Sequence, residues 1–335
     1  MTTSGAMVEL RGVSKRFAGR VDFADRLARM VRAPAHDGTV RALDDVSLQV
    51  REREVVGLVG ESGCGKSTLG RIVSRILEPT EGEVFWNGKP YRALEDNASR
   101  RERLAVQMIF QDPYASLNPR MRVADIVGEA PVVHGIVAAR EREVYVTEML
   151  SRVGLDRSAM RRFPHQFSGG QRSRIGIARA LAVKPRFLVC DEAVAALDVS
   201  IQAQVLNLFI RLREELALTY LFISHDLGVI RHLSDRVVVM YLGRIVESGP
   251  TSEVYAKPNH PYTTALIAEV PRIESRHRAY VPIRGEIPSP LAPPAGCHFH
   301  PRCPHAFARC REEVPRLQQI APGRHSACHL NETRT

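Results

Sequence analysis

The first feature that suggests chemistry is a glycine-rich loop in which residues 60–67 read Gly-Glu-Ser-Gly-Cys-Gly-Lys-Ser. Its glycines let backbone N–H groups face phosphate oxygens, because they carry no Cβ. The apolar run 54–59 before it suits a buried strand, and the helix expected after it would point its positive end at an anion. The alternative is a plain glycine-rich turn, which the Lys-Ser ending disfavours. We predict a phosphate site formed by Gly60, Ser62, Gly63, Cys64, Gly65, Lys66, Ser67 and Thr68.

Two residues of this loop are expected to act on the phosphates directly. A lysine at the end of such a loop carries its charge to the β- and γ-phosphates, and the hydroxyl that follows holds Mg²⁺. Lys66 and Ser67 occupy these positions. The loop therefore predicts ATP and Mg²⁺ as ligands, with Lys66 stabilising charge during catalysis.

A second motif follows about a hundred residues later, where Phe167 precedes Ser-Gly-Gly-Gln and then an amphipathic helical pattern. A serine before two glycines provides an N-cap and another anion-accepting helix start. Together with the phosphate loop, this string makes the chain resemble the ATP-binding subunits of ABC transporters. The resemblance implies that these residues close on ATP held by a second, facing subunit. They are Ser168, Gly169, Gly170 and Gln171.

Further residues occur in the order of that family. An apolar strand pattern ends in Asp191 and Glu192. The resemblance makes the first a support for Mg²⁺ and the second the catalytic carboxylate that polarises the attacking water. It makes Gln111 a sensor of Mg²⁺ and of the membrane partner, and His225 the catalytic switch histidine at the γ-phosphate. Taken singly, these residues also read as a solvated acidic turn or as ordinary strand-end side chains.

The nucleotide base requires a contact of its own. Phe17 is the candidate aromatic for stacking on adenine, although a lone aromatic is about as often a core residue. Val40, just after an insertion at 18–39, is the candidate to support the base.

Composition and patterning predict an α/β protein. The 335 residues are 44% hydrophobic and 25% charged, enough for one nucleotide-binding domain and an appendage. We expect a P-loop NTPase core with a mostly parallel sheet, and an antiparallel β-subdomain from the alternating pattern around residues 42–53. An ABC helical subdomain is expected at about 112–180. The domains would be 1–250 and a Cys-rich C-terminal extension, 251–335.

The chain shows no apolar run near the roughly 18 residues of a membrane span. We therefore expect a peripheral protein on the cytoplasmic face of the membrane. The resemblance implies two transmembrane permease subunits, a second ATPase subunit that is a copy or a paralogue, and indirectly an extracytoplasmic substrate-binding protein. The net charge of +10 is read as a solvated arginine-rich surface, without a nucleic-acid partner, because no basic tract is interleaved with aromatics.

Four of the six cysteines lie in the last forty residues, with five, six and seventeen residues between them. Thiols in a loop-rich segment of a cytosolic protein favour a metal over disulfides. The spacing does not fit paired zinc knuckles, and the resemblance implies a [4Fe-4S] cluster. Zinc and free thiols remain the alternatives. The predicted ligands are Cys297, Cys303, Cys310 and Cys328.

Three segments look like the oligopeptide/dipeptide importer ATPases: 111–120, 163–165 and 260–263. The resemblance implies ATP-driven peptide import, with nickel, glutathione and oligosaccharide import as alternatives. It also makes 111–120 part of the dock for the permease, with Tyr114 and Leu117 as candidate contacts. The rival from another class is a soluble ABC-type ATPase acting on nucleic acid or ribosomes.

Overall fold

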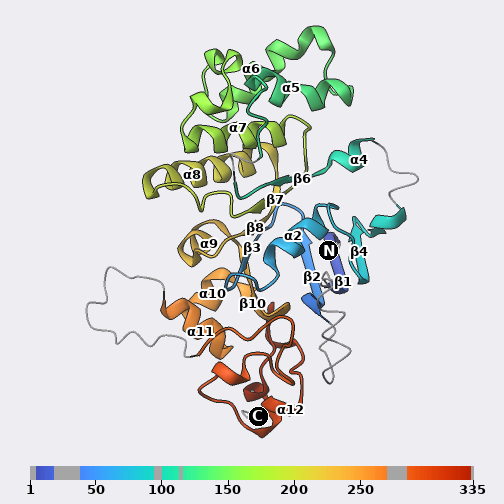
Figure 1. Ribbon diagram of the computed structural model, residues 1–335, viewed down its shortest axis with the longest axis vertical. Coiled ribbons are helices and arrows are strands. Elements are labelled where there is room, and N and C mark those ends of the chain that lie inside the picture. The colour runs from blue at the N-terminus through green and yellow to red at the C-terminus, as the bar shows by residue number, and fades with distance from the viewer. Residues whose placement is uncertain (1–4, 19–37, 94–99, 113–115, 270–284, 333–335) are drawn as a thin grey trace, which may run out of the picture.

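The computed structural model describes residues 5–18, 38–93, 100–112, 116–269 and 285–332 (Figure 1). Two sheets form its centre. A helical part lies at one end of the long axis, and the C-terminal segment lies at the other. The predicted combination of a mostly parallel core sheet, an antiparallel sheet and a helical part is thus confirmed.

The larger sheet is parallel from β9 to β6 and antiparallel beyond β9. Its parallel strands are short and mostly apolar, as expected from the sequence for residues 54–59 and for the run that ends in Asp191. In spatial order the strands of the whole sheet are β11 (Gln318–Ala321), β12 (Arg324–Ser326), β10 (Arg244–Pro250), β9 (Arg236–Tyr241), β3 (Val55–Val59), β8 (Thr219–Ile223), β7 (Phe187–Asp191) and β6 (Val106–Ile109).

Both faces of the parallel part of this sheet are buried, which explains why its strands are mostly apolar. Successive side chains of a strand point to opposite faces. In β3, Val55 and Val59 join one core cluster, whereas Val56 and Leu58 join the other. The central strand is therefore covered from both sides, and its end is a fixed platform for the loop that follows.

The smaller sheet covers one of those faces together with α2 (Lys66–Val73). Its strands pair antiparallel, and Leu10 of β1 and Val46 of β2 reach the shared core. The order is β2 (Thr39–Arg51), β1 (Ala6–Ala18), β4 (Glu81–Trp86) and β5 (Lys89–Pro90).

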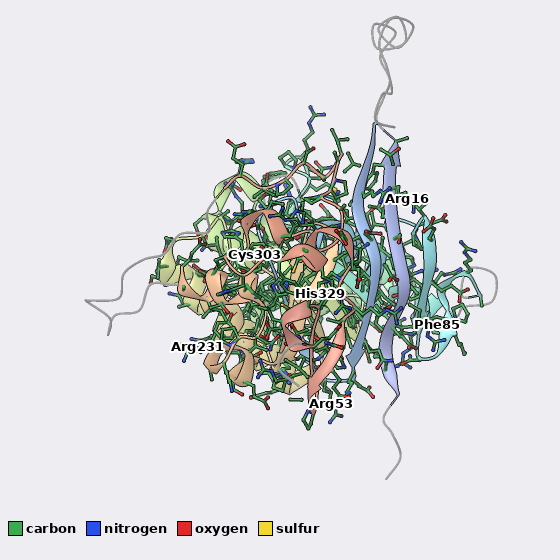
Figure 2. All side chains as sticks on the ribbon, turned by 90° about the horizontal axis from the view of Figure 1, so that it is seen from below. Arg16, Arg53, Phe85, Arg231, Cys303 and His329 are labelled. Carbon is green, nitrogen blue, oxygen red and sulfur yellow. The ribbon has the colours of Figure 1, made fainter. Side chains whose placement is uncertain are left out.

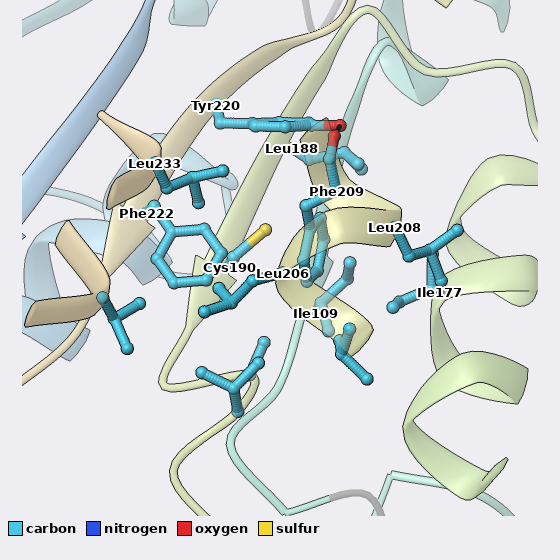
Figure 3. Close-up of a cluster of buried hydrophobic side chains, with 14 of the residues drawn as sticks. Ile109, Ile177, Leu188, Cys190, Leu206, Leu208, Phe209, Tyr220, Phe222 and Leu233 are labelled. Carbon is cyan, nitrogen blue, oxygen red and sulfur yellow. Dashed lines mark hydrogen bonds between the residues drawn. The ribbon is translucent and has the colours of Figure 1, made fainter. Parts of the chain in front are cut away.

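Helices cover the opposite face and form the helical part. In Figure 3, Phe209 of one helix packs against the sheet, with its ring edge-on to Tyr220 and Phe222 at centroid distances of 5.8 and 5.4 Å. No helix in the described ranges is long and apolar enough to span a membrane. The helices of this face and of the helical part are α5 (Val123–Val133), α6 (Arg142–Arg152), α7 (Gly169–Leu181), α8 (Val199–Leu216) and α9 (Leu227–Leu233), with 3₁₀ turns at Ala139–Glu141, Arg157–Arg161 and Pro164–Gln166. The short helix α4 (Arg100–Leu104) lies instead beside the edge strand β6.

The C-terminal segment is built from short elements, as its lack of periodicity suggests. Figure 2, which views the molecule from below, shows Cys303 and His329 in this segment. Through β12 it extends the core sheet, because Glu247 and Ser248 of β10 pair with Ser326 and His325. Its helices are α10 (Thr251–Ala256), α11 (Pro261–Ala268) and α12 (Ala308–Glu312), with 3₁₀ turns at His300–Arg302 and His329–Asn331.

A buried ion pair reinforces this junction. The Glu247 side chain is fully buried, and Arg324 donates to it at 3.2 Å. The same carboxylate accepts the backbone N–H groups of Asn259 at 2.9 Å and His260 at 2.8 Å. A buried charge needs such compensation, so Glu247 joins three stretches of chain at one point.

Removing this carboxylate should therefore loosen the C-terminal segment. Glu247→Gln leaves Arg324 buried without its counter-charge, and we expect it to lower the free energy of unfolding by about 3 kcal/mol. Glu313→Gln is the matched control, because it removes an exposed pair with Arg309 on the same segment. Urea denaturation followed by circular dichroism measures both. Equal midpoints for the two variants would contradict this account.

Candidate nucleotide site

The predicted phosphate loop lies between the end of β3 and the start of α2. Gly65 caps α2 with a φ of 106°, and no side chain caps the helix there. A Cβ at Gly65 would lie 2.2 Å from the carbonyl oxygen of Ala42, so this position requires glycine. The positive end of the α2 dipole thus faces the loop, as an anion site requires.

Lys66 is folded back onto the loop that precedes it. Its Nζ donates to the carbonyl oxygens of Gly60 at 2.7 Å and Glu61 at 2.9 Å, and the residue is only 5% exposed. An anion placed in the loop would compete for this ammonium group. Lys66 is therefore a charge held close to the expected phosphates.

Ser67 and Asp191 form the oxygen-rich part of the site. The Ser67 hydroxyl donates to Asp191 Oδ1 at 2.9 Å, across 124 residues of sequence. Burial raises the pKa of the Asp191 carboxyl, and the hydrogen bond from Ser67 opposes part of that rise. A hydroxyl and a carboxylate oxygen suit Mg²⁺, and the cation's charge would favour the ionised carboxylate that burial disfavours.

Three further predicted residues meet beside this pair. Gln111 Nε2 donates to Glu192 Oε2 at 2.5 Å, and His225 Nδ1 lies 3.3 Å from Glu192 Oε1. Gln111 follows β6, Glu192 follows β7 and His225 follows β8. Because these strands are parallel neighbours, their carboxyl ends bring all three residues to one edge of the sheet.

The Ser-Gly-Gly-Gln motif lies apart from this edge. Ser168 caps α7, and a capping box joins it to Gln171. The helix packs with α5, α6, α8 and β6, whereas α2 packs with β2, β7 and β8. A Cβ on Gly170 would lie 2.3 Å from Ile201, so the following helix closely covers this turn. The structure does not bring Ser168–Gln171 together with the phosphate loop of the same chain.

The base-binding candidates are neighbours in the smaller sheet. Phe17 of β1 pairs with Val40 of β2. Phe17 is 38% exposed, and Lys15 Nζ lies 5.3 Å from its ring centroid. An exposed aromatic is available for stacking, so the alternative that Phe17 is a core residue is wrong.

The predicted docking segment, 111–120, does not present Leu117 at the surface. Tyr114 lies outside the described residues. Leu117 is only 2% exposed and belongs to the core cluster of the helical part. Leu117 thus stabilises that part and is not an exposed contact.

The iron–sulfur prediction is wrong. Cys297, Cys303, Cys310 and Cys328 line one small pocket, but the described residues contain no group of three or more His, Cys, Asp or Glu placed to hold a metal ion. The zinc alternative fails on the same ground. Burial raises the pKa of Cys297 to about 11, so its thiol is protonated at neutral pH and packs as a small apolar group.

Two residues that the sequence did not indicate touch the phosphate loop. Arg302 forms a two-pronged pair with Glu61, at 2.7 and 2.9 Å. The Glu61 backbone N–H donates to the Tyr262 hydroxyl at 2.9 Å. Tyr262 lies within the 260–263 motif and Arg302 is next to Cys303, but neither signal identifies Glu61 as the partner.

Comparison with known proteins agrees with this geometry. A family described as "ABC transporter" matches residues 43–195, and "Oligopeptide/dipeptide transporter, C-terminal region" matches residues 246–310. Oligopeptide transport ATP-binding protein AppF of Bacillus subtilis is 48% identical over 328 residues, which cover 97% of each chain. This chain belongs to the ABC transporter ATP-binding subunits. The predicted family is therefore confirmed, and with it the assignment as an ATPase.

Other relatives of this ABC subunit extend the comparison. Dipeptide transport ATP-binding protein DppF of Haemophilus influenzae is 47% identical over 86% of this chain and 89% of its own. A solved structure, the ATP-binding cassette MJ0796 as a dimer in a post-hydrolysis state with ADP and Pi, has a TM-score of 0.62 at 28% identity. The match covers 73% of this chain and 99% of that cassette.

The loop glycines of the ABC subunit differ in what a side chain would meet. Gly63 has a φ of 78°, and a Cβ added there would have no heavy atom within 4 Å, so Gly63→Ala should cost only backbone strain, about 1–2 kcal/mol. Gly65→Ala adds a clash with the Ala42 carbonyl and should lower the melting temperature further. Thermal unfolding of both variants tests this. A Gly65→Ala protein as stable as Gly63→Ala would show that the loop can move away freely.

Proposed function

We propose that this chain is the ATP-hydrolysing subunit that energises peptide import through an ABC transporter. The observation that carries the proposal is the meeting of Gln111, Glu192 and His225 beside the Ser67–Asp191 pair. The names of the relatives, which are oligopeptide and dipeptide transport ATP-binding proteins, support peptides as the cargo. Nickel, glutathione and oligosaccharide import remain the alternatives for the same site.

In this proposal the phosphate loop holds ATP by position and charge. Lys66 leaves the carbonyl oxygens of Gly60 and Glu61 and binds the β- and γ-phosphates, while the α2 N-terminus faces the anion. Ser67 and Asp191, with Gln111 nearby, would hold Mg²⁺. Bound there, the ion would supply positive charge that offsets the negative charge of the phosphates.

Glu192 is the proposed group that orients and polarises the attacking water. Its carboxylate accepts from Gln111 and lies within hydrogen-bonding distance of His225. Both neighbours restrict its rotation, which favours a single alignment with the γ-phosphate. His225, whose side chain is 58% exposed, is free to turn toward that phosphate. Phe17 would stack on the adenine, with Val40 beside it.

A complete site requires two chains in this proposal. The Ser168–Gln171 turn and the phosphate loop lie on different parts of one chain, so the turn serves the ATP held by a facing copy or paralogue. Further partners are two transmembrane permease subunits and, through them, an extracytoplasmic substrate-binding protein. The chain would act at the cytoplasmic face of the membrane, with residues 1–250 as the nucleotide-binding domain and 251–335 as the extension.

Removal of the loop charge provides the first test. Lys66→Ala should abolish ATP turnover and weaken ATP binding at least about a hundredfold, because a charge-assisted contact to two phosphates is lost. Calorimetric titration with Mg-ATP and a phosphate-release assay measure the two effects. Unchanged turnover would exclude Lys66 from the site.

Removal of the catalytic carboxylate separates binding from hydrolysis. Glu192→Gln should keep ATP affinity and lower turnover about a thousandfold, since only the water-orienting charge is lost. The ATP-bound protein should then accumulate as a dimer in size-exclusion chromatography with light scattering. Native turnover in this variant would refute the role of Glu192, and a monomer that still binds ATP would refute the two-chain site.

A further inference from the structure

Glu61, the second residue of the phosphate loop, is held at each of its polar groups. Its N–H donates to the Tyr262 hydroxyl at 2.9 Å, and its carbonyl oxygen accepts from Lys66 at 2.9 Å. Its carboxylate accepts both prongs of Arg302. Tyr262 and Arg302 lie 201 and 241 residues away in sequence, in the C-terminal segment. The loop is therefore anchored from outside the cassette that contains it.

The anchor is rigid. Tyr262 is completely buried, and its ring packs on Tyr241 and Phe299 at centroid distances of 4.6 and 5.3 Å. The Arg302 side chain is only 5% exposed, and its guanidinium also donates to the Tyr241 hydroxyl at 3.4 Å. A planar fork on a carboxylate fixes both distance and angle, unlike a single contact.

We propose that Arg302 and Tyr262 are positioning residues, through which the C-terminal segment sets the ATP affinity of the phosphate loop. The proposal rests on the ATP site proposed above. Tyr262 keeps the Glu61 amide in place, and Arg302 neutralises a negative charge carried by the same loop that would receive the polyphosphate. Binding to a preformed loop avoids the cost of ordering it, and a compensated Glu61 avoids repulsion.

Arg302 is proposed to act partly by neutralising the charge of Glu61. An experiment can therefore distinguish its role from a general loss of fold stability. Arg302→Met should raise the Kd and KM for Mg-ATP about tenfold, the loss of one charge-assisted pair, while kcat changes less than about twofold. The increase should shrink in high salt, because salt screens the uncompensated Glu61 carboxylate. Arg302→Lys, which keeps the charge and loses the fork, should fall between wild type and Arg302→Met.

The rescue variant is Glu61→Gln combined with Arg302→Met. Removing the carboxylate should restore much of the ATP affinity lost in Arg302→Met alone, giving a non-additive double-mutant cycle. Tyr262→Phe should also raise the Kd, but its effect should not depend on salt, since it removes a neutral hydrogen bond. Two control variants change the same segment without changing the contacts of Glu61. Arg309→Ala changes an exposed arginine of the same segment, and Arg324→Met loosens the segment without touching Glu61.

Isothermal titration calorimetry of the full chain with Mg-ATP measures the Kd of every variant. A wild-type affinity in Arg302→Met, additive effects with Glu61→Gln, or an equal loss in Arg324→Met would each overturn the proposal. A wild-type chain that does not bind ATP would instead refute the proposed function, so the two failures are distinguishable.

Discussion

The parallel pairing of β3, β8, β7 and β6 is the constraint on which the site depends. Parallel neighbours end at the same edge of a sheet, so the residues after each strand must meet there. The phosphate loop follows β3, and Gln111, Glu192 and His225 follow the other three strands. Both faces of the sheet are packed, so the strands cannot slide past one another without moving apolar side chains into water. The geometry of the site is thus set by the core.

This constraint explains why so much was predictable from the sequence. The apolar run 54–59 before the glycine-rich loop and the apolar run before Asp191 and Glu192 give both the strands and the residues at their ends. The capping serine of α7 is likewise a local signal, because its partner Gln171 lies three residues away. The exposure of Phe17 was not local information. Its pattern fits a core aromatic equally well, and its place near the end of β1, opposite Val40 of β2, decides the question.

The C-terminal segment shows where such reasoning fails. Its four cysteines in a loop-rich stretch suggested a metal site, yet the structure shows contacts between this segment and the cassette. β12 joins the core sheet, Arg324 compensates the buried Glu247, and Phe299 packs on Tyr241. Each of these contacts links residues far apart in sequence, so no local pattern encodes them. The cysteines that were predicted as ligands line the small pocket that remains in this segment.

The same contacts make the segment and the phosphate loop depend on each other. Arg302 is nearly as buried as a core residue, and a buried guanidinium without a counter-charge is strongly unfavourable. Glu61 supplies that counter-charge, but it can do so only while the loop keeps its present path. Any rearrangement of the loop must therefore either carry the Arg302–Glu61 fork with it or break a desolvated ion pair. The path of the loop is in this way held by a charge pair whose second member, Arg302, lies 241 residues away in sequence.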